Sequence, residues 1–307
     1  MTPPPDPVRS TSPAVAAWEA RGEYRRCAGV TAFTVDVACT GPEAAEPLLV
    51  LHGFPTCSFD FHRVVDDWAH DRRVLLVDLV GFGLSDKPDA RYSVERYADV
   101  AQAFVEASGV DSLALLSHDL GDTVGGELLA RNLEDRWPVE VTRRVLTNGS
   151  IYIEMAHLSA GQQLLLSLPD ERLPEAPGIN ATAMAASLAA TFSPASPVDH
   201  DELAAAWELI ARHDGHLLLA RTIRYIEDRR RNEARYTGAI ETHPAPLAVV
   251  WGTDDPIAVA EMARRLCATR PGTPLTWLEN VGHYPMLEAP ERFAAAVRQA
   301  LAALARR

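Results

Sequence analysis

The chain has 307 residues, 47% of them apolar and 23% charged, so it is long enough to bury the core of one large domain. A formal net charge of −13 argues against nucleic acid and against anionic membrane surfaces as partners. No apolar run approaches the length that crosses a bilayer, so we expect a cytoplasmic protein without a membrane span.

The chain begins with a segment rich in Pro, Ser and Thr that has no apolar signal region, and we expect a flexible arm over residues 1–20. Strand-like and helix-like patterns then alternate, and most of the strands are unbroken apolar runs typical of parallel strands covered on both faces. The expected strands are residues 24–27 and 32–39, which form a hairpin, and 47–52, 73–79, 112–117, 141–147, 247–251 and 274–278. Amphipathic helices are expected at residues 93–108 and 290–304. This order predicts a doubly wound α/β fold with a mostly parallel, eight-stranded sheet.

One long stretch interrupts the alternation. Residues 150–240 show only helical patterns separated by Pro and Gly. They are expected to form a helical lid over the strand ends, where open α/β sheets bind ligands. Residues 21–149 and 241–307 would then form the core domain.

The four cysteines are scattered without a C-x-x-C motif, which fits free thiols in a reducing compartment. The two histidines in residues 213–216 have no further ligand cluster after them, so we expect no metal and no cofactor.

Residues 113–125 read as an apolar strand, a tight turn and the start of a helix. Small residues stand two positions before and two after Asp119, at Ser117 and Gly121, as in the nucleophile elbow of hydrolases that use serine. Ser117 itself lacks small flanking residues, so the elbow belongs to Asp119. Taken alone, Asp119 would be better explained as a helix N-terminal cap.

A carboxylate nucleophile restricts the chemistry. Its attack on an ester would give a reactive anhydride, whereas displacement at a saturated carbon gives an alkyl ester that water can cleave. Epoxides and alkyl halides are the electrophiles that fit. The sequence therefore favours one of these two substrates if Asp119 is the nucleophile.

Two further residues follow in the order of a nucleophile–acid–histidine triad. Asp255 comes just after the expected strand 247–251, and His283 comes after the last expected strand. An acid in this place orients the histidine and stabilises its imidazolium form. The spacing after the strand favours Asp255 over Asp254, and the rival position, Asn148, cannot carry a charge. Three such residues in order make a coincidence improbable.

The motif His-Gly-Phe-Pro-Thr follows the third expected strand, at residues 52–56. The backbone N–H groups of Phe54 and Leu120 can form an oxyanion hole for the hydrolysis of an ester intermediate. His52 is interpreted mainly as an anchor for this loop. The residues expected around the pocket are His52, Gly53, Pro55, His118, Tyr152 and Tyr284.

From about residue 24 to residue 304 the sequence resembles the α/β-hydrolase superfamily. The motifs at residues 52–55, 81–86 and 118–121 look like those of its epoxide hydrolase and haloalkane dehalogenase branch. Residues 117–124 and 148–149, with the lid residues 214–240, are most similar to the mesoderm-specific transcript group of that branch. The resemblance implies an α/β-hydrolase fold with an Asp nucleophile.

Two departures from that branch weigh against halide chemistry. Leu120 stands where many members carry a Trp whose indole N–H helps to hold the halide, and Phe54 stands where dehalogenases tend to have Asn. Epoxide hydrolases instead resemble one another in lid tyrosines that donate to the epoxide oxygen. The resemblance places Tyr225 at one such position, although it can equally be a packing residue. For the second position, Tyr152 and Tyr236 are the substitutes.

These features predict an epoxide hydrolase for a small apolar substrate, working as a monomer or homodimer. A haloalkane dehalogenase with the same catalytic residues and a non-catalytic binding protein of the same fold are the alternatives.

Overall fold

All eight expected strands pair into one sheet in the order β1-β2-β4-β3-β5-β6-β7-β8. The computed structural model describes residues 10–42, 44–175 and 178–305. Strands β1 and β2 pair antiparallel, β2 runs antiparallel to β4, and every later pairing is parallel. The predicted α/β-hydrolase sheet is thereby confirmed. The strands are β1 Glu23–Cys27, β2 Val30–Val37, β3 Ala45–Leu51, β4 Arg72–Val77, β5 Ser112–His118, β6 Glu140–Thr147, β7 Leu247–Gly252 and β8 Leu275–Leu278.

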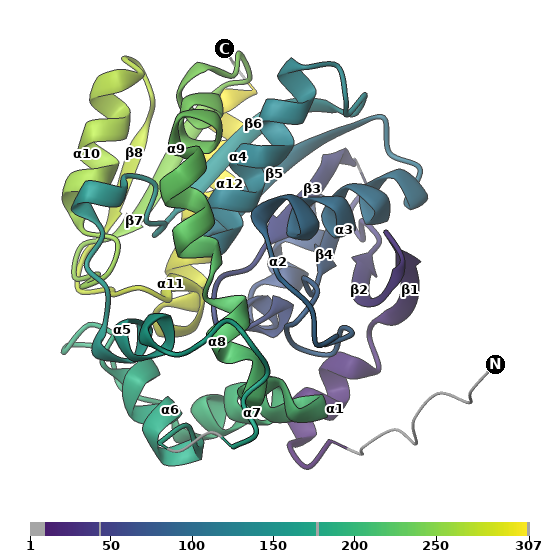
Figure 1. Ribbon diagram of the computed structural model, residues 1–307. Coiled ribbons are helices and arrows are strands. Elements are labelled where there is room, and N and C mark those ends of the chain that lie inside the picture. Colours follow the sequence, from purple (N-terminus) through teal and green to yellow (C-terminus); the bar gives the residue numbers. More distant parts are fainter. Residues whose placement is uncertain (1–9, 43, 176–177, 306–307) are drawn as a thin grey trace.

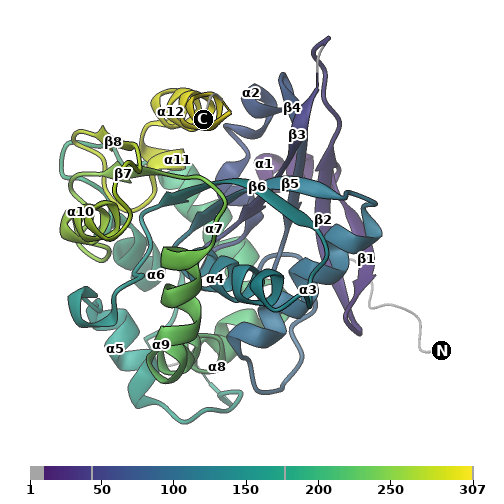
Figure 2. The same ribbon diagram turned by 90° about the horizontal axis from the view of Figure 1, so that it is seen from above.

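Helices cover both faces of the sheet, which explains why its central strands are almost wholly apolar. Every residue of β7 is buried, as is all of β5 after its first residue. Helices α2 and α12 lie on one face, and α3 and α4 lie on the other (Figure 2). The core helices are α2 Val65–Ala69, α3 Val94–Ala107, α4 Leu120–Leu133, α10 Ala260–Thr269, α11 Pro285–Glu288 and α12 Pro290–Leu304, with the 3₁₀ helix η1 at Ser58–Phe61.

Helix α3 illustrates how local sequence sets the element bounds. The Ser93 side chain accepts a hydrogen bond from the Arg96 N–H and so caps the first turn. The apolar stripe that includes Tyr97 and Phe104 is buried against the sheet. The helix stops before Gly109, whose φ of +65° is in the left-handed region that glycine adopts readily.

The segment between β6 and β7 is helical in all of its described secondary structure. We call it the insertion; most of it lies along the lower side of the molecule in Figure 1, and its last helix rises beside the sheet. It contacts loops that follow the parallel strands: Gly81 after β4 touches Thr222, and the Thr191 carbonyl accepts from the His283 N–H after β8. Its elements are η2 Ile153–Met155, α5 Ala160–Ser167, α6 Ala181–Ala189, α7 His200–Ala211, η3 Arg212–Leu218, α8 Leu219–Thr222 and α9 Tyr225–Thr242.

Helix α9 belongs to both the insertion and the core. It bends at Asn232, whose φ of −120° is not helical, and its later half packs against α4. The contact there is so close that a Cβ on Gly126 would lie 2.7 Å from the Tyr236 carbonyl oxygen. This packing fixes the start of α9, and therefore Tyr225, relative to the start of α4.

The expected flexible arm over residues 1–20 is wrong for its second part. Pro13–Glu19 form helix α1, which the Ser12 side chain caps. The helix is ordered because Val15 and Trp18 are buried in the core and because Glu208 of α7 accepts hydrogen bonds from the Thr11 and Ser12 N–H groups. Residues 1–9 of that prediction lie outside the described residues.

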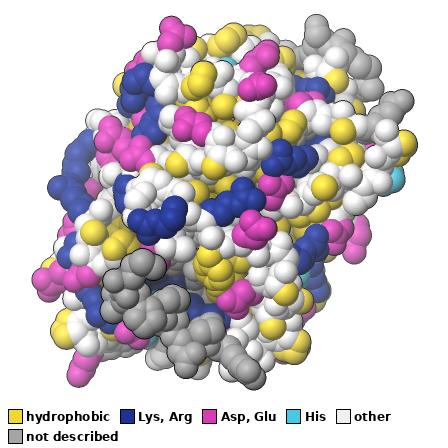
Figure 3. Space-filling view, turned by 90° about the vertical axis from the view of Figure 1, so that its right-hand side faces the viewer, with side chains coloured by type: hydrophobic (Ala, Val, Ile, Leu, Met, Phe, Trp, Pro, Cys, Tyr) yellow, Lys and Arg dark blue, Asp and Glu magenta, His cyan; other side chains and the backbone are white. Residues whose placement is uncertain are grey.

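The surface shown in Figure 3 carries acidic and basic side chains side by side, without a large field of one sign. No helix within the described ranges is both long and apolar enough to cross a membrane. Among the same residues, no group of three or more His, Cys, Asp or Glu side chains is arranged to hold a metal ion.

Candidate active site

Asp119 stands at a sharp turn between β5 and α4. Its φ of 49° and ψ of −115° lie outside the regions that non-glycine residues favour. Two glycines let the neighbouring loops close on it. A Cβ on Gly53 would lie 2.8 Å from the Asp119 Cβ, and a Cβ on Gly121 would lie 2.4 Å from the Leu51 carbonyl oxygen. Strain of this kind persists where the surrounding structure enforces it, and it concentrates at functional sites.

Asp119 is only 2% exposed, and its carboxylate has polar neighbours on two sides. Its Oδ2 accepts a hydrogen bond of 2.8 Å from the Phe54 N–H, and its Oδ1 lies 3.8 Å from Nε2 of His283. The Leu120 N–H is one of the first amides of α4, which have no acceptor inside the helix. The Phe54 amide thus donates to this carboxylate, and the Leu120 amide follows Asp119 directly in the chain.

His283 is oriented by Asp255, as the order of motifs predicts. The His283 Nδ1 lies 2.8 Å from the Asp255 Oδ2. The Oδ1 atom of Asp255 accepts from the N–H groups of Ile257 and Ala258, which fixes the carboxylate at the end of β7. Asp254 is exposed and instead accepts a hydrogen bond from the Ser193 hydroxyl. The structure therefore brings Asp119, His283 and Asp255 together.

Asn148 helps to hold Asp255 in place, a role that the amino-acid sequence did not suggest. Its amide nitrogen donates to the Asp255 Oδ2 at 2.8 Å, while its Oδ1 accepts from the Gly252 N–H. The residue thus ties the end of β6 to the acid that orients His283. Its missing charge led the sequence reasoning to set it aside, and only the pairing of β6 with β7 reveals the contact.

The imidazole of His283 is protonated in this environment. Burial lowers its pKa, but the charges of Asp255 and Asp119 raise it more, with a net pKa of about 9. An imidazolium between two carboxylates cannot act as a base. Conversion of Asp119 to a neutral ester would remove one of these charges and lower the pKa of His283.

Tyr225, the first residue of α9, is buried beside Phe54, with their ring centroids 5.7 Å apart. Burial raises the pKa of the Tyr225 hydroxyl well above its usual value, and the nearby Asp119 charge raises it further. No described residue forms a hydrogen bond with this hydroxyl. Tyr225 is therefore a neutral, unengaged donor close to Asp119.

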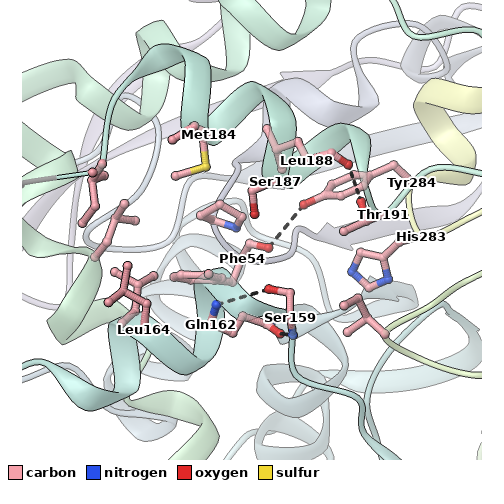
Figure 4. A pocket seen from close by; sticks show the side chains of 18 residues that line it. Phe54, Ser159, Gln162, Leu164, Met184, Ser187, Leu188, Thr191, His283 and Tyr284 are labelled. Carbon is pink, nitrogen blue, oxygen red and sulfur yellow. Dashed lines mark hydrogen bonds between the residues drawn. The ribbon is translucent and has the colours of Figure 1, made fainter.

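A cavity of about 130 Å³ leads to His283 between the insertion and the core. Its walls are mainly apolar, with Leu164, Met184 and Leu188 from the insertion facing Phe54 (Figure 4). The predicted pocket residues Pro55 and Tyr284 line it as well, and the Tyr284 hydroxyl donates to the Phe54 carbonyl at 3.3 Å. Phe54 adjoins the cavity, Asp119 and Tyr225 at once.

Four residues predicted for the pocket do not line this cavity. Both ring nitrogens of His52 are bound by backbone groups of Gly53 and Leu79, which supports its role as an anchor. His118 lies behind His283, its Nε2 2.8 Å from the His283 carbonyl oxygen. Tyr152 points elsewhere and donates to Glu241. Gly53 lines no cavity wall either, because it packs directly on Asp119.

Asp122, one turn into α4, is a buried acid that the sequence reasoning passed over. It accepts a hydrogen bond from the Ser117 hydroxyl, and its Oδ2 has no hydrogen-bond partner among the described residues. Burial raises its pKa well above the usual range, and the nearby charge of Asp119 raises it further.

Comparison with known proteins identifies the family of the chain. Residues 48–296 match the sequence pattern of the alpha/beta hydrolase family. The chain is 36% identical over 291 residues to the Mycobacterium tuberculosis protein named "Putative hydrolase LipZ", covering 93% of this chain and 97% of that protein. It is 32% identical over 300 residues to the mesoderm-specific transcript homolog protein of Bos taurus, covering 94% of this chain and 88% of that protein. A thermophilic esterase from Thermogutta terrifontis superposes with a TM-score of 0.71 at 20% identity, covering 92% and 97% of the two chains.

Proposed function

The chain belongs to the alpha/beta hydrolase family, and from that premise we propose that it is an epoxide hydrolase in which Asp119 is the nucleophile. The observation that supports this most directly is the carboxylate at the strained elbow. It accepts from the Phe54 N–H and faces His283, whose other ring nitrogen is held by Asp255.

In the first step the Asp119 carboxylate attacks a carbon of the epoxide. A carbon–oxygen bond to Asp119 forms, the strained carbon–oxygen bond breaks, and its electron pair stays on the epoxide oxygen. That oxygen takes a proton from Tyr225, which lies beside Phe54 at the start of α9. With the Asp119 charge gone, the imidazolium of His283 loses part of its stabilisation and gives up its proton as Tyr225 is reprotonated.

In the second step neutral His283 removes a proton from water, which attacks the carbonyl carbon of the ester. The Phe54 and Leu120 amides stabilise the oxyanion that forms. Collapse of this intermediate releases the diol, and His283 and Asp119 return to the charged pair. Asp255 holds the imidazole in one orientation through both steps.

The cavity points to the class of substrate. A cavity of about 130 Å³ is close in size to an apolar cavity of roughly 150 Å³ that accommodates benzene. Its apolar walls favour an uncharged epoxide with one ring or a short alkyl chain, and among the described lining residues none but His283 carries a charge. The insertion supplies most of these walls and would act as a lid.

Two other chemistries are less well supported. Halide release needs a donor for the departing anion, but the Leu120 side chain has none and no Trp is among the residues that line the cavity. Ester hydrolysis, which the name of the T. terrifontis relative suggests, would require Asp119 to form an anhydride. The strained conformation of Asp119 supports catalysis rather than binding alone.

The test of this proposal is a single turnover in ¹⁸O-labelled water with a monoaryl epoxide and excess enzyme. We expect the first diol to contain ordinary oxygen from Asp119 and the label to appear in the Asp119 peptide. The reason is that water attacks the ester carbonyl rather than the epoxide carbon. A labelled first diol would mean direct attack by water and would rule out the covalent mechanism.

Tyr225→Phe tests the proton donor. An epoxide oxygen leaves as an alkoxide and needs a proton, so we expect formation of the alkyl-enzyme to slow on the order of 10²-fold. The measurement is the single-turnover rate of adduct formation. Tyr24→Phe, at an exposed tyrosine of β1, is the control and should change this rate little. An unchanged rate in Tyr225→Phe would remove the residue from the site.

A further inference from the structure

Arg229 is a buried cation without a counter-ion. The residue lies one turn after Tyr225 on α9 and is only 2% exposed. Within the described part of the chain no carboxylate lies at ion-pair distance from it, and its Nε and Nη1 have no hydrogen-bond partner. A buried, unpaired charge is costly and is rarely present without a use.

The guanidinium lies against the Tyr225 ring. Its central carbon is 5.5 Å from the ring centroid, a distance at which a cation is attracted to an aromatic face. Its charge lowers the pKa of Asp122, although burial raises that pKa more. The guanidinium lies on the Tyr225 ring and is therefore placed to interact with negative charge that develops there.

We propose that Arg229 is a positioning residue that stabilises the phenolate of Tyr225 as this residue donates its proton to the departing epoxide oxygen. This inference rests on the proposed epoxide opening. When the proton leaves, the electron pair of the O–H bond stays on the Tyr225 oxygen and spreads into the ring. A guanidinium on that ring interacts more strongly with the phenolate than with the neutral phenol, so it lowers the barrier for proton donation.

The charges near Tyr225 support this role. Burial and the Asp119 carboxylate both raise the pKa of the Tyr225 hydroxyl, and Arg229 is the group that lowers it. During the same step Asp119 loses its charge to the ester. Arg229 then remains as a cation next to the new phenolate.

A double-mutant cycle tests whether Arg229 acts through Tyr225. The rate of covalent adduct formation from a monoaryl epoxide would be measured by acid quench and intact mass in wild type, Arg229→Met, Tyr225→Phe and the double variant. We expect Arg229→Met to slow the reaction on the order of tenfold with Tyr225 present. In the Tyr225→Phe variant, Arg229→Met should have no further effect on the rate. Arg229→Lys, which keeps a cation, should recover most of the rate.

Thermal unfolding separates this role from a packing role. Removing an unpaired buried charge should leave the melting temperature of Arg229→Met unchanged or higher. Arg231→Met, at an exposed position of the same helix, is the control for the substitution itself and should affect neither rate nor stability.

Equal slowing by Arg229→Met with and without the Tyr225 hydroxyl would overturn the inference, as would no slowing at all. In either case adduct formation in the wild type would still uphold the proposed function. Absence of an adduct in the wild type would instead reject the proposed function, and the inference with it.

Discussion

Asp119→Ala is expected to lower epoxide turnover on the order of 10⁴-fold or more, because the variant has no group that can form the alkyl ester. The fold should persist. Asp119 follows a buried strand and its carboxylate makes one backbone hydrogen bond, with Phe54, so its loss costs little packing. The measurement is diol formation under saturating substrate, together with the circular dichroism spectrum of the variant.

The control for this variant is Asp254→Asn. Asp254 is exposed, and its carboxylate is held by the Ser193 hydroxyl outside the site. It should keep nearly full activity. If Asp119→Ala hydrolyses the epoxide as fast as the wild type, the nucleophile is another group and the elbow has a structural role.

His283→Gln is expected to accumulate the covalent ester. Formation of the ester needs the Asp119 carboxylate and a proton donor, whereas its hydrolysis needs a base. Loss of that base should slow the second step roughly 10²–10⁴-fold, and Gln preserves a polar group of similar reach. Intact-protein mass spectrometry after incubation with a monoaryl epoxide should show one added substrate mass.

In the wild type the adduct should be absent at long times, because His283 there acts as the base that hydrolyses the ester. His70→Gln, an exposed histidine at the end of α2, is the matched control and should behave as the wild type. Full steady-state activity in His283→Gln without any adduct would contradict a two-step mechanism in which His283 is the base.

The sequence by itself predicted the sheet and the order of its strands along the chain. Most of the strands are apolar runs long and continuous enough to be read without tertiary information, because strands buried on both faces admit few polar residues. The same reasoning missed helix α1. Its burial depends on contacts of Trp18 with distant residues such as Ser58, and a Pro- and Ser-rich composition gives no sign of them.

The sequence also determined which residues were candidates for chemistry. Asp119, Asp255 and His283 each follow a strand, and the carboxyl ends of parallel strands meet at one edge of the sheet. Local spacing therefore predicts their meeting, and the structure places them within hydrogen-bonding or near-contact distance. For Phe54 the same logic applies, since its loop follows β3, next to β5.

Only the tertiary structure decided what surrounds these residues. Asn148 reaches Asp255 because β6 pairs with β7, although 106 intervening residues separate the two positions along the chain. Two nitrogens of the buried Arg229 have no hydrogen-bond partner among the described residues, and Tyr152 donates to Glu241, away from the cavity. Such side-chain contacts depend on how elements distant in sequence pack together. Composition and spacing within one segment carry no information about that packing.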